Sequence, residues 1–357
     1  MKETNTIEPD FAVHPGRLLA RVLKQREMTQ KELAERTGIN KKTINDIVNG
    51  TAAITYGTSV GLERVLGVPA SFWMNAESIY QTRKKRLEEL EEHKNFLKEP
   101  ALKELVSRRF VPKSKTAEES VNNILRFFRV GSVSVLQSQF PIGVSLRQSQ
   151  SAKAKRDPLA LLCWWRCCEL ECEKIACRNY DASKFKAAVQ KIRSMTSRRP
   201  SECFEQIQKM CAECGVAVVA VDQFKNADVK GAAERRKEKA FIMLNGHVPF
   251  ADIFWFSFFH EAGHILKTMR NFRYIEGWGS RKESDRNRLE EEERKANEFA
   301  RSLLIPKKYE SELPSLKTSQ QIAEFADRIG VHPGIVVGRL GHDRHKKAFD
   351  ELRLALS

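Results

Sequence analysis

The five-residue stretch His260-Glu261-Ala262-Gly263-His264 constrains this 357-residue chain more than any other part of its sequence. Two histidines four positions apart lie on one face of an α-helix, about one turn apart, so both imidazoles can reach a single zinc ion. Glu261 sits beside them, where it can act as a general base toward water on the metal without being a ligand. The preceding residues 253–259 are almost all apolar. The motif therefore predicts a buried helix from about Ala251 to Lys267 around a metal site.

A third protein ligand has to come from another part of the chain. The strongest candidates are the glutamates at 290–293, at the start of a helix predicted from about Leu289 to Leu304. Helical spacing places Glu293 and Asn297 on one face of this helix. We choose Glu293 as the third ligand and keep Glu292 as the alternative, while the other two glutamates are expected to form a solvated acidic face.

These two motifs resemble those of the ImmA/IrrE metallopeptidase family. The family's Trp-Phe-x-x-x-His-Glu-x-Gly-His pattern appears as Trp255 to His264, and its Glu-x-x-Ala-Asn-x-Phe-Ala pattern appears as Glu293 to Ala300. The resemblance extends from about Ala160 to Leu340. It implies an α+β zincin-like, more narrowly gluzincin-like, domain with Zn²⁺ as cofactor. It also implies His260, His264 and Glu293 as the metal ligands and Glu261 as the catalytic base.

Two strands are predicted in this part of the chain, Val216–Val221 and Ala240–Leu244. In zincins the strand beside the metal commonly pairs with an extended peptide substrate, so we expect residues Phe241 to Leu244 to form that strand. His247 and Tyr274 are candidates for stabilising an oxyanion. A purely structural role is the alternative for each of them.

The region from residue 14 to about residue 80 has the pattern of a compact run of short helices. Thr29 and Glu32 predict a capping box at the start of one helix. Gly38 lies where a tight turn needs positive φ, and Asn40 can cap the next helix. That helix turns apolar residues inward, namely Ile44, Ile47 and Val48. Its outward positions are Lys41, Lys42, Thr43, Asn45 and Asn49, side chains that bind phosphates and base edges.

About the first 80 residues resemble the Xre-type helix-turn-helix, and more closely its HigA-like antidote branch. The resemblance rests on His14-Pro15-Gly16, on Thr29 to Ala34, on Asn49-Gly50 and on Gly67 to Trp73. It implies that Gln30 holds a phosphate of double-stranded operator DNA and that the following helix reads the major groove. The DNA-binding set is then Gln30, Asn40, Lys41, Lys42, Thr43 and Asn45. Relatives of this kind usually dimerise, so a homodimer on a palindromic operator is implied. A helical bundle that binds only protein is the alternative.

Composition is consistent with such a protein. The 62 basic and 46 acidic residues give a formal net charge of +16, which favours a polyanionic partner, although a merely basic surface would give the same excess. No apolar stretch approaches the roughly 20 residues that a membrane span needs. The start of the chain lacks the features of a secretion signal. We therefore expect a cytoplasmic protein with no membrane partner.

Five of the eight cysteines crowd into residues 163–177. Spacings of about four residues predict that Cys163 and Cys167, and with them Cys168 and Cys172, lie along one flank of a helix as small buried residues. A redox or metal role of this cluster is the alternative. Cys211 and Cys214 form a lone C-x-x-C without a second pair at zinc-finger spacing, so a structural zinc there is a minor alternative.

The sequence thus predicts a mainly α-helical chain with a small β-sheet, in three parts. Residues 1–80 form the helix-turn-helix domain, residues 81–157 a charged helical connector, and residues 158–357 the zinc metallopeptidase domain. Within the connector, Pro100 is expected to end or kink a charged helix, and residues 148–156 are expected to be a linker.

Two functions are consistent with these features. The first is a transcriptional regulator fused to a zinc-dependent endopeptidase that cleaves a regulatory protein such as a repressor or an antitoxin. The second is a HigA-like antitoxin or repressor whose zinc domain is a sensor or scaffold without turnover.

Overall fold

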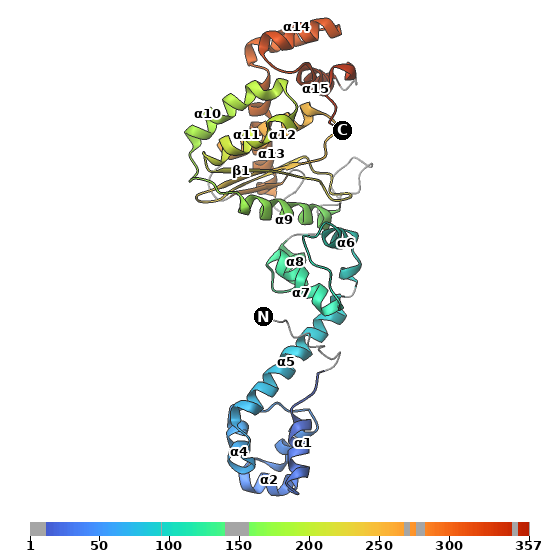
Figure 1. Ribbon diagram of the computed structural model, residues 1–357, viewed down its shortest axis with the longest axis vertical. Helices are drawn as coiled ribbons and strands as arrows, with labels where there is room; N and C mark the ends of the chain where they lie inside the picture. Colours follow the sequence, from blue (N-terminus) through green and yellow to red (C-terminus); the bar gives the residue numbers. More distant parts are fainter. Residues whose placement is uncertain are drawn as a thin grey trace. The chain divides into compact units, whose positions relative to one another are not determined.

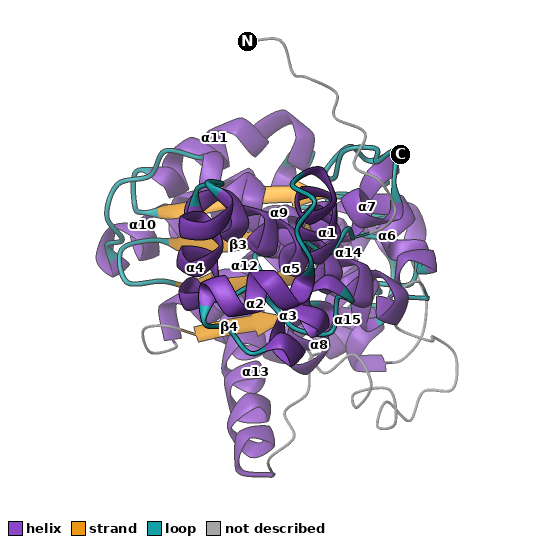
Figure 2. Cartoon of the chain, turned by 90° about the horizontal axis from the view of Figure 1, so that it is seen from below, coloured by secondary structure: helices purple, strands orange, loops and turns teal. Residues whose placement is uncertain are grey.

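The computed structural model describes residues 12–93, 95–139, 157–267, 272–275, 283–344 and 349–356. Within these ranges the chain is mostly helical with one four-stranded sheet (Figure 2), as the sequence predicts. It divides into two compact units: the first holds residues 1–99 and 112–126, and the second holds residues 100–111 and 127–357. The predicted connector is therefore shared between the units. The predicted linker at 148–156 lies outside the described residues.

The secondary structure described in the first unit is all helical. Its elements are α1 (Gly16–Gln25), α2 (Gln30–Thr37), α3 (Lys41–Val48), α4 (Tyr56–Leu66), α5 (Ala70–His93), a 3₁₀ turn at Phe96–Lys98, and most of α7 (Ala117–Phe128). One residue from each of the first five helices is fully buried in a shared core: Leu19, Leu33, Ile44, Leu62 and Trp73. Five short or partly buried helices thus stabilise one another through a common apolar centre.

The turn between α2 and α3 forms as its residues predict. Thr29 caps α2 by accepting a hydrogen bond from the backbone N–H of Glu32. The Glu32 carboxylate, however, pairs with Arg36 at 2.6 Å, so the expected reciprocal bond of a capping box is replaced by an ion pair along the helix. Gly38 ends α2 at φ 72°, and the Asn40 side chain caps α3 by accepting from Lys42 N.

The second unit contains most of the helices and the whole sheet. Its helices are α6 (Pro100–Ser107), α8 (Val133–Gln139), α9 (Pro158–Lys174), α10 (Ala182–Arg193), α11 (Pro200–Ala212), α12 (Ala251–Lys267), α13 (Glu283–Leu304), α14 (Ser319–Ile329) and α15 (Pro333–Arg344), with 3₁₀ turns at Ser194–Ser197, Lys307–Ser315 and Asp350–Leu352. None of the described helices is long and apolar enough to cross a membrane.

Two helix boundaries differ from those predicted. Pro100 opens α6 and does not end the preceding helix, which stops at His93, because proline at the first helical position loses no hydrogen bond. The helix with the candidate third ligand begins at Glu283, six residues before the predicted start. Its first turns are too polar to show the apolar periodicity on which the prediction depended.

The sheet contains β1 (Val216–Val221), β2 (Gly231–Arg235), β3 (Ala240–Asn245) and β4 (Phe272–Ile275), in the order β1-β3-β2-β4. β3 runs parallel to β1 and antiparallel to β2, and β4 is antiparallel to β2. Both edges of β3 are therefore hydrogen-bonded within the sheet. The prediction that Phe241–Leu244 pairs with a substrate is wrong, because that strand lies in the interior of the sheet.

Helices cover the two faces of this sheet (Figure 1). α9 lies on one face, while α11 and α12 lie on the other. Alternate residues of β1 and β3, including Val218 and Ile242, share a core cluster with Trp255 and Phe258 of α12. Because strand side chains alternate between faces, an apolar strand buried on both sides needs a helix layer on each. The α12 layer holds the candidate site.

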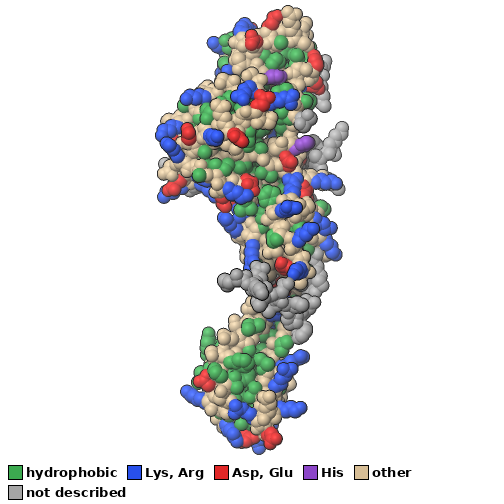
Figure 3. Space-filling model, in the orientation of Figure 1, with side chains coloured by type: hydrophobic (Ala, Val, Ile, Leu, Met, Phe, Trp, Pro, Cys, Tyr) green, Lys and Arg blue, Asp and Glu red, His purple; other side chains and the backbone are tan. Residues whose placement is uncertain are grey.

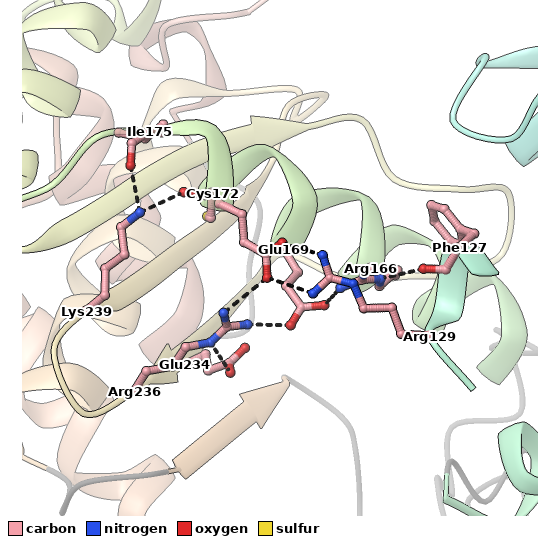
Figure 4. Close-up of polar contacts among 10 residues, drawn as sticks. Phe127, Arg129, Arg166, Glu169, Cys172, Ile175, Glu234, Arg236 and Lys239 are labelled. Carbon is pink, nitrogen blue, oxygen red and sulfur yellow. Dashed lines mark hydrogen bonds and ion pairs between the residues drawn. The ribbon is translucent and has the colours of Figure 1, made fainter. Parts of the chain in front are cut away.

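A network of charged side chains stabilises the α9 face (Figure 4). Arg236, just after β2, donates to Glu234 of β2 at 2.8 Å, to Glu173 of α9 at 3.2 Å, and to Glu169 of α9. Glu169 and Glu234 are almost fully buried. Removing one member of such a buried network would leave uncompensated charge, which typically costs about 3–5 kcal/mol. The network therefore fixes β2 to α9.

Candidate metal centre

The histidine motif lies on α12, which is buried along almost its whole length. His260, Glu261 and His264 are 6%, 1% and 1% exposed. Aromatic side chains of the preceding turns hold this helix in the core, including a stacked pair formed by Trp255 and Phe259 at 6.3 Å between ring centroids. The helix thus presents polar side chains that could bind a metal next to a largely apolar core.

Three possible ligand atoms converge at one point. His260 Nε2 and His264 Nε2 are 3.1 Å apart, and each lies 3.6 Å from one oxygen of Glu293. A tetrahedral zinc with bonds of about 2.0–2.1 Å would hold its ligand atoms about 3.4 Å from one another. Among the described residues, these three form the one group of histidine, cysteine and carboxylate side chains that could hold a metal ion. The residues present therefore fit a zinc ion with three protein ligands.

The protonation states of this group favour metal binding. Burial lowers the pKa of His264, which keeps its imidazole neutral. Burial raises the pKa of Glu293, but its electrostatic interactions with His260 and His264 outweigh burial and lower that pKa to about 2. Neutral imidazole and ionised carboxylate are the forms that bind zinc.

The third ligand reaches the histidines because α12 and α13 pack very closely. A β-carbon on Gly263 would lie 3.1 Å from Ala296 Cα and 3.1 Å from a ring carbon of Phe299. Glycine at this point lets the backbones of the two helices approach, and the small, buried Ala296 and Ala300 face the same contact. Glu293 is one turn before Ala296 on α13. The Glu293 carboxylate thus reaches His260 and His264 because α12 and α13 pack so closely.

Asn297 connects two of the ligands. Its Oδ1 lies 3.2 Å from His260 Nδ1, and its Nδ2 donates to Glu293 Oε2 at 3.5 Å. An acceptor at Nδ1 places the proton of His260 there and leaves Nε2 free to bind a metal. Helical spacing alone predicts Asn297 on the same face as Glu293 but indicates no role for it. Its position four residues after Glu293, on the same helical face, is the sequence feature that could have indicated this contact with the ligands.

The other residues named from the sequence lie outside this cluster of ligand atoms. Glu292 is half-buried and does not belong to the converging group. His247 is exposed in the loop after β3. The backbone of Tyr274 pairs with Ala233 in the sheet, and the position of its side chain is outside the described part of the structure. An oxyanion role for His247 or Tyr274 stays a prediction.

The residues predicted to contact DNA surround the start of α3. Lys41, Lys42 and Asn45 are exposed, and Gln30 and Thr43 are half-exposed. Asn40 caps α3 by accepting one hydrogen bond at its side-chain oxygen, and its amide N–H groups can donate to a further partner. Exposed cationic and amide groups at the N-terminal end of the second helix are what a recognition helix requires.

Comparisons with known families give independent matches to both regions. Residues 19–73 match the helix-turn-helix family, and residues 211–340 match the IrrE N-terminal-like domain, a family of peptidases. A search of curated proteins gave no match.

Two similar solved structures each cover about a quarter of this chain and most of their own length. A HigA-family addiction module antidote protein from Coxiella burnetii is 26% identical over 24% of this chain and 90% of its own, with a TM-score of 0.21. The Pseudomonas aeruginosa antitoxin HigA, solved with the higBA promoter, is 26% identical over 25% of this chain and 98% of its own, with a TM-score of 0.22. The chain therefore joins an N-terminal helix-turn-helix domain to a C-terminal metallopeptidase-type domain of the IrrE N-terminal-like family.

Proposed function

We propose that this protein is a DNA-binding regulator with a zinc-dependent endopeptidase that cleaves a regulatory protein, such as a repressor or an antitoxin. The observation that supports it most strongly is the convergence of His260, His264 and Glu293 within 4.8 Å of one another. Three protein ligands leave the fourth zinc position for water or substrate, as in catalytic zinc sites. Glu261 lies in the same helix, directly beside a ligand.

The residues of the chain have distinct tasks in this reaction. When bound, zinc would act as a Lewis acid toward the scissile carbonyl and make water a competent nucleophile near neutral pH. Glu261 takes a proton from the attacking water and passes it to the leaving amine. His260, His264 and Glu293 hold the ion, and Asn297 orients two of them.

We propose that an extended substrate pairs with β4. Among the described strands, β1 and β4 are the outer ones of the sheet, and β4 pairs with β2, whose Gly231 lies against Glu261. Backbone pairing at a free edge is a common way to bind a peptide. N-methylation of one backbone amide in a peptide inhibitor should therefore weaken inhibition, and unchanged inhibition by every N-methylated analogue would refute this placement.

For the first unit we propose binding to an operator as a homodimer, in the cytoplasm where that operator would lie. The large apolar side chains that are exposed among the described residues all belong to this unit: Val13, Tyr56, Val60, Phe72 and Ile79. Figure 3 shows apolar surface on the same unit. Exposed apolar patches mark interaction surfaces. Replacing Phe72 and Ile79 with glutamate should convert the dimer to monomer in analytical ultracentrifugation, and a monomeric wild type would refute the homodimer.

A sensor or scaffold without turnover is the competing function, and Glu261→Gln separates the two. This change removes the base but none of the three ligands, so zinc content should stay near one ion per chain while peptide cleavage falls by about 10²–10⁴-fold. His260→Ala should lose both zinc and cleavage. If the wild type binds zinc but cleaves no more than Glu261→Gln, the scaffold reading is correct. If the wild type cleaves and Glu261→Gln does not, proteomic comparison of cells that express the two proteins would identify the substrate.

Operator binding is tested by removing two charges from α3. Lys41→Ala with Lys42→Ala should weaken binding and reduce the slope of log affinity against log salt by about 2, since two phosphate contacts are lost. Lys184→Ala with Lys186→Ala removes the same charge from exposed positions of α10 and should leave affinity and slope unchanged. Equal effects of the two pairs in a gel-shift titration would contradict the assignment of α3 as the recognition helix.

A further inference from the structure

Gly231, the first residue of β2, lies directly against the side chain of Glu261. A β-carbon at Gly231 would be 2.6 Å from Glu261 Oε1, 3.0 Å from its Cγ and 3.1 Å from its Cδ. Real β-carbons essentially never come within 3.0 Å of a heavy atom of a residue that is not a chain neighbour. Any other amino acid at residue 231 would therefore have to displace the Glu261 carboxylate.

The backbone gives no reason for glycine at this position. Gly231 pairs with Leu244 in a regular antiparallel ladder and has no left-handed φ. Gly38 differs, because its φ of 72° favours glycine while no atom lies near the place of a β-carbon. The next residues of β2, Ala232 and Ala233, have side chains and are fully buried. What distinguishes residue 231 from its neighbours on β2 is the space that Glu261 occupies.

Displacement here would affect chemistry more than folding. The three crowded atoms belong to one flexible side chain, so Glu261 would rotate away while the strand and α12 stay in place. A general base has to lie within hydrogen-bond reach of the proton that it takes. A shift of about 1 Å can already cost about 10²-fold in rate.

We propose that Gly231 is a positioning residue: its missing side chain leaves the volume that the Glu261 carboxylate fills and so fixes that base relative to His260, His264 and Glu293. The catalytic consequence rests on the proposed peptidase function. The steric relation between Gly231 and Glu261 does not depend on that function.

The first test is Gly231→Ala, assayed with fluorescein-labelled casein. We expect zinc content and melting temperature close to wild type, kcat lower by about tenfold or more, and KM within about twofold. Ala232→Ser also adds one heavy atom to β2, but on the opposite face of the sheet, and should leave kcat within about twofold. Wild-type kcat in Gly231→Ala would overturn the proposal, as would an equal loss in Ala232→Ser.

A shortened base supplies the second test. Glu261→Asp withdraws the carboxylate by one methylene, so in that background Gly231→Ala should change kcat by less than about twofold. Full additivity of the two losses would count against a steric relation. If Gly231→Ala does not fold, recovery of folding in Gly231→Ala with Glu261→Ala supports the proposal, and continued failure to fold overturns it.

A wild type that cleaves no casein would challenge the peptidase function and leave the steric proposal open to direct test. A crystal structure of Gly231→Ala should then show the Glu261 carboxylate moved by roughly 1 Å or more. An unmoved carboxylate refutes the proposal whatever the activity.

Discussion

At the scale of single residues, the centre depends on side chains that bind no metal. Asn297 contacts His260 Nδ1 and Glu293 Oε2, and so holds two ligands from two helices in one arrangement. Such partners of metal ligands fix the tautomer of the histidine and limit the motion of the carboxylate. Replacing such a partner should lower the affinity for metal more than it lowers the stability of the fold.

Replacing Asn297 with alanine should weaken zinc binding by about 10–100-fold, because His260 and Glu293 lose their common partner. Competition with a chromophoric chelator would measure this affinity. Asn297→Asp keeps an acceptor oxygen for His260 and should retain most of the affinity. Glu298→Ala, at an exposed neighbouring position, should have no effect. Wild-type affinity in Asn297→Ala would show that its contacts do not support the metal.

The buried cysteines should react slowly with alkylating reagents. Seven of the eight are buried and Cys177 is half-buried. Burial raises the pKa of the thiols of Cys163, Cys168 and Cys172 far above the ordinary value, so they carry almost no reactive thiolate at pH 8. Native alkylation with iodoacetamide, followed by mass spectrometry, should label Cys177 at least about tenfold faster than these three. Equal labelling in the folded protein would contradict the burial.

At the scale of elements, the contact between α12 and α13 assembles the site. Each helix alone carries an incomplete ligand set, and Gly263 allows them to approach until Glu293 meets the histidines. Arg193 of α10 holds the end of α13 by donating to the backbone oxygens of Leu303 at 2.6 Å and Leu304 at 3.2 Å. These carbonyls have no partner within the helix. The position of α13 is thus fixed at both the site and its C-terminal end.

Gly263→Ala should destabilise the second unit by about 1–3 kcal/mol, because the new β-carbon meets backbone atoms of α13 that cannot rotate away. It should also weaken zinc binding by separating Glu293 from the histidines. Gly57→Ala in α4, where no atom lies within 4 Å of the added carbon, is the matched control and should change neither quantity. Denaturant titration and chelator competition measure the two effects. A stable Gly263→Ala protein with wild-type zinc affinity would contradict the role given to this contact.

Two helix pairs in the chain share one local pattern and differ in environment. α2 and α3 are joined through Gly38 at φ 72°, and α14 and α15 through Gly330 at φ 69°; each second helix begins three residues after its glycine. The outward face of α3 is exposed, whereas Ile335, Val336 and Val337 of α15 are buried. A further contact fixes α15, since a β-carbon on Gly338 would lie 2.7 Å from Asp252 of α12. The second pair therefore packs against the helix that carries the candidate site, and the described side chains at the start of its second helix are mostly buried.

At the scale of the whole molecule, the two units have separate apolar cores. Ligands of one unit should therefore stabilise that unit alone. We expect two calorimetric transitions. Removing zinc that is present at about 100 times its Kd should cost the second unit about 2.7 kcal/mol, or about 5–10 °C. Operator DNA should raise the other transition. A single transition that shifts as a whole with either ligand would show that the units unfold together.

The sequence by itself determined the parts that depend on local spacing. Two histidines four residues apart on an apolar helix face one point, and Thr29, Gly38 and Asn40 specify a helix-turn-helix because caps and turns act over a few residues. The small, partly charged strands β2 and β4 were not predicted, because their pairing depends on partners distant in the chain.

Only the tertiary structure decided which distant groups meet. It selected Glu293 over Glu292 through the approach of α13 to Gly263, and it placed Gly231 against Glu261. It also exposed α3 and buried α15, although the turns before them have the same form. Exposure and long-range contact are properties of the complete packing, so the same local pattern gives a surface suited to DNA in one unit and a support for the metal centre in the other.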